Sequence, residues 1–102
     1  MTYTITKYDL VPPEALYKDR NLTLQRCLEA LGLKWNGTII FLEKDTIENI
    51  CELEYMLRIA CKLGIYGTLE LQGVGVDPLK YEIIAGTCHI FKWVGKIAWK
   101  SA

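Results

Sequence analysis

The chain has 102 residues, of which 51% are hydrophobic. This is enough to fill the core of one small domain, so we expect a single domain over residues 1–102. Twelve Lys and Arg side chains balance twelve Asp and Glu side chains, which excludes a generally basic nucleic-acid coat and a strongly acidic mimic.

Residues 1–7 carry no basic segment followed by an apolar one, so no signal peptide is predicted. Charged side chains interrupt the apolar stretches every few residues, whereas a membrane span needs about 20 apolar residues. We therefore expect a cytoplasmic protein with no membrane partner. In that compartment Cys27, Cys51, Cys61 and Cys88 are predicted to be free, buried thiols.

The first predicted element is a strand, because residues 2–8 alternate threonine with larger apolar side chains. Pro12 and Pro13 are expected to end it, since proline has no N–H to donate to a neighbouring strand. Pro13 then opens a short helical turn, with Glu14 near its positive end.

A helix is predicted over residues 21–31. Its apolar side chains follow the i, i+3, i+4, i+7 spacing of one helix face: Leu24, Cys27, Leu28 and Leu31. Asn21 or Thr23 is expected to cap the start, and Gly32 the end. After a turn at residues 35–37, the apolar run 38–42 predicts a short strand covered on both faces.

The most strongly patterned element is a long helix over residues 46–63. Asp45 is expected to cap it, with Glu48 at the reciprocal third position, and Gly64 is expected to end it. Its second half is apolar around most of its circumference, which indicates burial on more than one side. Such a helix lies in the concavity of a sheet or forms part of an oligomer interface.

The remaining elements are all predicted strands, over residues 68–72, 79–85 and 87–94, with a strand tail at 97–99. The order is therefore β-α-β-α-β-β-β, with the helices early and the strands late. This order predicts an α+β fold, in which a C-terminal antiparallel meander is packed by the one long buried helix.

No residue pattern identifies a reaction, a metal or a cofactor. No two cysteines have the close spacing of zinc ligands, and His89, the one imidazole, lies in no signature for thiol catalysis. Gly73-Val74-Gly75 lacks the third glycine and the following helix of a dinucleotide site. We therefore expect no catalytic residue, metal or cofactor.

Two surfaces are candidates for partner binding. The first combines aromatic and basic side chains near the C-terminus: Phe91, Lys92, Trp93, Lys96, Trp99 and Lys100. Three interpretations stay open for it: an edge strand that buries its aromatic rings and is protected by lysines, a protein interface, and a nucleic-acid surface. The second is acidic and lies near the start of the long helix, where Glu48 and Glu52 face each other if both are helical.

The favoured hypothesis is a small non-enzymatic binding module that occupies a protein partner, as inhibitors, immunity proteins, adaptors and phage accessory proteins do. The apolar helix at 46–63 also suggests a homodimer. One alternative is nucleic-acid binding through the C-terminal lysines and aromatic rings. Another is a small-ligand sequestering or processing protein, with a pocket between the long helix and the sheet and His89 as its acid-base group.

The zero net charge conceals an uneven distribution. Residues 1–78 carry 8 basic and 11 acidic side chains, whereas residues 79–102 carry 4 basic and 1 acidic. If the acidic helix start and the lysine-bearing strands lie far apart, a two-sided interaction becomes plausible; if they are neighbours, the charges neutralise each other.

Overall fold

A computed structural model describes residues 2–87 and 89–95 of the protein. It confirms a mixed α+β fold with the predicted meander at its C-terminal end. The elements in chain order are β1 (Tyr3–Val11), α1 (Glu14–Tyr17), α2 (Leu22–Ala30), β2 (Leu33–Trp35), β3 (Ile40–Leu42), β4 (Thr46–Ile47), α3 (Ile50–Lys62), β5 (Tyr66–Gly73), β6 (Leu79–Ile83) and β7 (Ile90–Val94).

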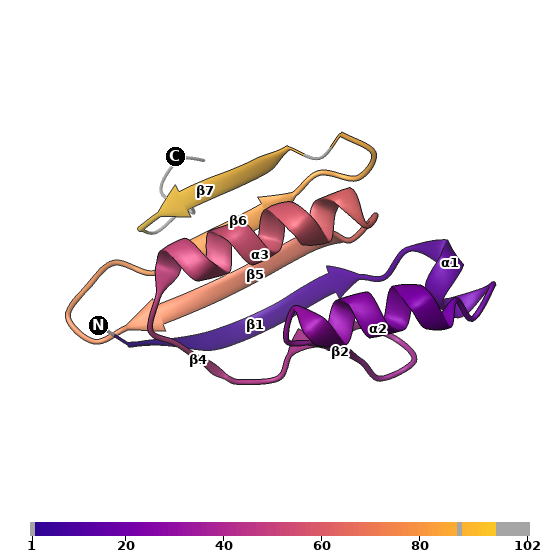
Figure 1. Ribbon diagram of the computed structural model, residues 1–102. Helices are drawn as coiled ribbons and strands as arrows, with labels where there is room; N and C mark the ends of the chain where they lie inside the picture. Colours follow the sequence, from indigo (N-terminus) through magenta and orange to yellow (C-terminus); the bar gives the residue numbers. More distant parts are fainter. Residues whose placement is uncertain (1, 88, 96–102) are drawn as a thin grey trace.

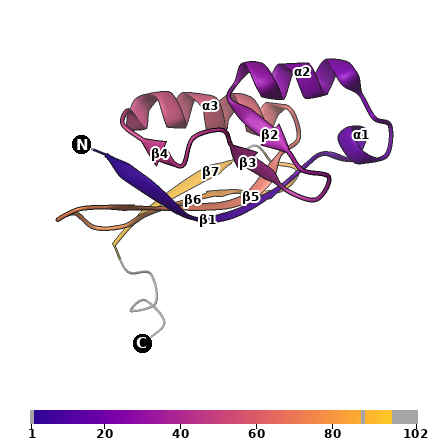
Figure 2. The same ribbon diagram turned by 90° about the horizontal axis from the view of Figure 1, so that it is seen from below.

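The described strands form one antiparallel sheet in the order β2-β3-β1-β5-β6-β7, with β4 also paired to β1. Helices α2 and α3 lie on the same face of this sheet, and α3 runs over β5 and β6 (Figures 1 and 2). The opposite face of the sheet carries no helix in the described chain (Figure 2), and we call it the open face. The layered architecture thus separates a helix-side surface from an open sheet surface.

Alternation along the strands decides which side chains enter the core. On β5 and β6 the side chains that face the helices are buried: Leu69, Leu71, Leu79, Tyr81 and Ile83. Successive side chains on a strand point to opposite faces, so Lys80 and Glu82 lie on the open face. Each β7 residue shares a face with its cross-strand partner on β6, which places Phe91 beside Glu82 and Trp93 beside Lys80.

Helix α2 matches its prediction closely. The Asn21 side chain caps it by accepting a hydrogen bond from the Leu24 N–H at 3.0 Å, and Leu28 is buried. Gly32 follows with a φ of +82°, a left-handed conformation that glycine adopts without strain. The short turn predicted after Pro13 is α1, which begins with Glu14.

The start predicted for the long helix is wrong. Helix α3 begins at Ile50, because the Asn49 side chain caps it by accepting from the Glu52 N–H at 3.2 Å. Asp45 instead accepts a hydrogen bond from the Tyr8 hydroxyl at 3.3 Å. The intervening residues 46–47 form β4, since the edge of β1 offers them backbone partners.

Strand β2 is a second difference, because no strand is predicted before the turn at residues 35–37. Leu33 pairs with Leu42 across a β2–β3 hairpin. The hairpin turn uses the Asn36 side chain, whose Oδ1 accepts from the N–H groups of Thr38 and Ile39 at 2.9 and 3.0 Å. Residues 38 and 39 therefore belong to the turn, and β3 is shorter than the predicted strand.

The last two strands are shorter than predicted at the turn that joins them, and β5 is longer than predicted. Strand β6 stops at Ile83 and β7 starts at Ile90, because the chain reverses through residues 84–87, where Gly86 has a φ of +77°. The strand tail predicted at 97–99 lies outside the described residues. No helix in the described chain is long and apolar enough to span a membrane.

Among the three cysteines that the structure describes, Cys61 alone is buried as predicted. Cys27 and Cys51 are exposed on the solvent side of α2 and α3, because the sheet and the neighbouring helix cover other faces of these helices. Cys88 lies outside the described residues. Two of the three described thiols are therefore open to solvent.

Candidate functional site

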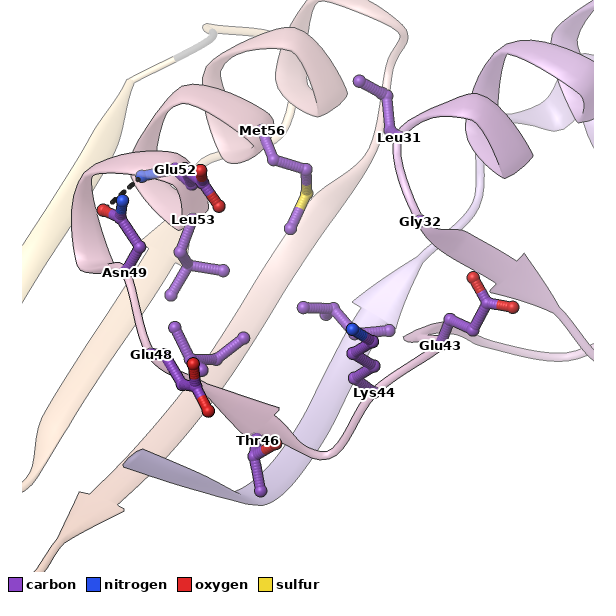
Figure 3. Close-up of a pocket in the computed structure, with 12 residues that line it drawn as sticks. Leu31, Gly32, Glu43, Lys44, Thr46, Glu48, Asn49, Glu52, Leu53 and Met56 are labelled. Carbon is purple, nitrogen blue, oxygen red and sulfur yellow. Dashed lines mark hydrogen bonds between the residues drawn. The ribbon is translucent and has the colours of Figure 1, made fainter. Parts of the chain in front are cut away.

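A cavity of about 550 Å³ lies on the helix side, beside the start of α3 (Figure 3). Its apolar side chains come from four elements or their ends: Leu31, Leu42, Ile47, Leu53 and Met56. Charged side chains line it as well: Glu43, Lys44, Glu48 and Glu52. We call this feature, defined by these nine residues, the acidic-rimmed pocket.

Local structure explains how the walls form. Leu53 and Met56 extend from α3 toward the hollow (Figure 3), and Leu31 lines it from the end of α2. The Glu43 N–H donates to the Gly32 carbonyl at 2.8 Å, which ties the end of β3 to the turn after α2. The pocket is therefore framed by two helix ends and by the chain between β3 and α3.

The rim carries more negative than positive charge. Glu43 forms an exposed ion pair with Lys34 at 3.7 Å, which is a weak interaction in solvent. Within residues 2–87 and 89–95, no ion pair engages Glu48 or Glu52, and both are exposed. Their carboxylates, with Lys44 as the cation at the rim, are thus open to a ligand.

The two acidic residues singled out from the sequence both line this pocket, but for a different reason than predicted. Glu48 precedes the Asn49 cap and is not helical, so it does not stand one helical turn from Glu52. The chain between β4 and α3 carries Glu48 to the same rim (Figure 3).

The predicted aromatic row is confirmed on the open face for the residues that the structure describes. The His89 and Phe91 rings are 6.5 Å apart between centroids, and Phe91 is stacked with Trp93 at 6.5 Å. Phe91 is 47% exposed. Lys96, Trp99 and Lys100, the other members of this candidate surface, lie outside the described residues.

Lys92 points to the helix side, away from the aromatic row. Its Nζ contacts Glu54 of α3 at 3.0 Å and lies 5.8 Å from the centre of the Tyr81 ring. The Tyr81 hydroxyl donates to the same Glu54 carboxylate at 2.6 Å. One lysine of the C-terminal region is therefore neutralised by an acid of α3, whereas Glu48 and Glu52 stay at the pocket.

This network shifts the ionisation of its members. The hydrogen bonds from Tyr81 and then from Lys92 lower the pKa of Glu54 below its ordinary value of 4.5. Burial, followed by the bond to Glu54, raises the pKa of Tyr81. Glu54 is thus held ionised and Tyr81 is held protonated. In these states Glu54 on α3 accepts hydrogen bonds from Tyr81 on β6 and from Lys92 on β7, which links the three elements.

The open face carries both lysines and acids, with three acids and two lysines in its two central rows. Cross-strand pairing lines up Lys7, Glu70, Lys80 and Trp93 in one row, and Asp9, Thr68, Glu82 and Phe91 in the next. Lys7 and Glu70 form an ion pair at 3.6 Å. Each lysine therefore has an acid beside it, and these rows provide no continuous cationic track.

The small-ligand alternative needs His89 beside a pocket, but the sheet separates His89 from the acidic-rimmed pocket. His89 lies on the open face with Phe91, whereas the acidic-rimmed pocket lies on the helix side. A cavity of about 150 Å³ does lie between α3 and the sheet, lined by Glu54, Arg58, Tyr81, Ile90 and Lys92. In the described chain no three His, Cys, Asp or Glu side chains are grouped as a metal site requires.

Sequence reasoning missed the apolar half of the pocket. Leu31 and Met56 are part of predicted apolar helix faces, but nothing in their spacing shows that the two faces meet. The one available signal is that α3 has more apolar side chains than contact with a sheet needs.

No protein-family model, curated protein or solved structure matches this chain.

Proposed function

We propose that the protein is a small binding module that occupies a protein partner through the acidic-rimmed pocket. The observation that supports this proposal most directly is the pocket's composition, with apolar walls beneath a rim of exposed carboxylates. Recognition sites combine an apolar pocket, which contributes affinity, with a few polar groups that fix orientation. At about 550 Å³, the cavity holds more than a single side chain.

A sterically blocked variant tests the proposal. Thr46 is exposed and lines the pocket, and tryptophan is accepted in strands, so Thr46→Trp is expected to fill the mouth without unfolding β4. Peptides selected from a displayed random library on the native protein are expected to bind Thr46→Trp at least about tenfold more weakly. Fluorescence polarisation measures the affinities.

The matched control is Thr38→Trp, which adds the same ring to an exposed turn residue of the β2–β3 hairpin, outside the pocket. Selected peptides are expected to bind this variant as they bind the native protein. Circular dichroism shows whether both variants fold. Equal affinity of the peptides for Thr46→Trp and the native protein would refute the proposal.

The aromatic row favours a second candidate, single-stranded nucleic acid, because stacked and exposed rings such as Phe91 can receive bases. Lys92 is turned toward α3, and acids flank Lys7 and Lys80, so we rank this candidate below the pocket. Titration with oligothymidylate at low salt tests it: tryptophan quenching that weakens in Phe91→Ala supports the candidate, and unchanged fluorescence excludes it.

The homodimer expected through residues 46–63 stays a prediction. Within the protomer, α3 already buries its most apolar face: Leu53, Met56, Leu57, Ala60 and Cys61. Its exposed side carries Tyr55 with Arg58 and Lys62, so Tyr55 is the residue through which we propose such contact. Light scattering at rising protein concentration tests this, and a mass that stays monomeric excludes it.

A further inference from the structure

We infer that the occupant of the acidic-rimmed pocket is a short basic, amphipathic segment of a protein, in which large apolar side chains lie next to lysine or arginine. This inference rests on the proposed function and names the chemistry of the partner. It follows from the walls of the pocket, from the charge at its rim and from a comparison with other described surfaces.

The walls select for apolar side chains. Leu53 and Met56 of α3 are buried, and Leu31 is half-buried at the end of α2. Methionine adapts its shape to different apolar partners more readily than branched side chains do. A leucine, methionine or phenylalanine of the partner would displace water from this surface, at roughly 25 cal/mol for each Å² of apolar surface removed from water.

The rim selects for positive charge next to that apolar side chain. Three glutamates and one lysine line the pocket, which gives a formal charge of −2 at its mouth. Glu43 is engaged by Lys34, so Glu48 and Glu52 are the acids available to a partner. Exposed charges of this kind steer association and discriminate against partners of the same sign.

Other described surfaces fit a basic amphipathic segment less well. On the open face, Lys7 and Lys80 stand against three acids, Asp9, Glu70 and Glu82, so these rows carry a formal charge of only −1, and Lys7 pairs with Glu70. The cavity at Glu54 already contains Lys92 and Arg58 as its cations. The acidic-rimmed pocket differs from these surfaces because it combines a cavity with apolar walls and a formal charge of −2 at the rim.

A panel of three labelled peptides tests the inference. The first, about twelve residues long, contains Leu, Lys and Gly; the second replaces every Lys by Glu; the third replaces every Leu by Ser. We expect the Leu/Lys peptide to bind at least about tenfold more tightly than either of the others, and to lose affinity as salt rises. Fluorescence polarisation gives the three dissociation constants.

Charge reversal of the protein adds a stricter criterion. The double variant Glu48→Lys/Glu52→Lys is expected to reverse the preference, so that it binds the Leu/Glu peptide more tightly than the Leu/Lys peptide. The control is Asp19→Lys, which changes an exposed acid outside the pocket and should leave the native preference unchanged. A reversal identifies the rim, because an unfolded protein would lose affinity for both peptides.

The possible failures are distinguishable. If the Leu/Lys and Leu/Glu peptides bind equally, or if Asp19→Lys reverses the preference as well, the basic partner is excluded. The proposed function still stands in that case, provided that Thr46→Trp abolishes the binding of library-selected peptides. If Thr46→Trp has no effect either, both the partner chemistry and the docking site are wrong.

Discussion

Gly67 of β5 occupies a place where no side chain fits. Its φ is +124°, and a Cβ built on it would collide with the carbonyl oxygen of Asp9 on β1. The residue pairs with Leu10 on one side and with Ile83 on the other. The close approach of β1 and β5 at the centre of the sheet therefore depends on glycine at this position.

Gly67→Ala is expected to destabilise the protein by at least about 2 kcal/mol, because both the backbone strain and the collision with β1 oppose folding. Gly86→Ala is the matched control, since its φ of +77° is also positive but its Cβ would meet open space. Urea unfolding measures both free energies. Equal losses for the two variants would contradict a steric role for Gly67.

Tyr81→Phe removes the hydroxyl that donates to Glu54 at 2.6 Å. We expect a loss of about 1–2 kcal/mol in the free energy of unfolding, since a hydrogen bond to a charged acceptor contributes that much. Tyr55→Phe, at a side chain that is 67% exposed, is the control and should change little. Urea titration at neutral pH compares them, and identical midpoints would show that the bond contributes nothing.

Helix α3 illustrates how two capping signals compete within one stretch of sequence. Asp45 followed by Glu48 matches the pattern of a helix start, and so does Asn49 followed by Glu52. The second pair acts as the start because β1 engages residues 46–47 as a strand and the Tyr8 hydroxyl engages Asp45. Both interactions come from residues about forty positions earlier in the chain, which local patterns do not reveal.

Asn49→Ala is therefore expected to cost about 1 kcal/mol of stability, the usual loss when a helix cap is removed. Asn49→Asp keeps an oxygen acceptor for the Glu52 N–H and should retain most of the stability. Thermal unfolding followed by circular dichroism measures both. Asn49→Ala with native stability would mean that this side chain does not cap the helix.

Strand β7 shows what alternation predicts and what it leaves open. Period two places His89, Phe91 and Trp93 on one face and Lys92 on the other, as observed. The periodicity does not say which face lies under the helix. Because Lys92 faces α3, it stabilises the fold through Glu54 instead of adding charge to the aromatic row.

The pH dependence of stability is a property of the whole molecule. In the folded protein the pKa of Glu54 is lowered, so its stabilisation is present above pH 4.5 and is lost as the pH falls. Burial, followed by the charge of Asp45, raises the pKa of Tyr8 to about 12 from 10.0. Its stabilisation is present below pH 10 and is lost as the pH rises toward 12.

We therefore expect the free energy of unfolding to be highest between these limits and to decline on both sides. Glu54→Gln should flatten the acidic decline, because it removes a group whose pKa falls on folding. Tyr8→Phe should reduce the alkaline decline but not abolish it, because the raised pKa of Tyr81 contributes to the same decline. Chemical unfolding at a series of pH values measures the profile. A profile that the substitutions leave unchanged would rule out these two groups as its cause.

The sequence alone determined those elements whose signals are local. The apolar spacing and the Asn21 cap predict α2, the sustained apolar pattern predicts the body of α3, and alternation predicts the C-terminal meander. Glu48 and Glu52 were identified as candidates because acids gather near a helix start. Each of these signals lies within one or two helical turns or along one strand.

Tertiary structure alone decided the rest. Strands β2 and β4 are too short to carry a period, and they exist because β3 and β1 offer them backbone partners. The acidic-rimmed pocket likewise requires Leu31 and Met56 to meet from two different helices. Neither contact has a local signature, because the residues involved are brought together only by the register of the sheet and the packing of helices upon it.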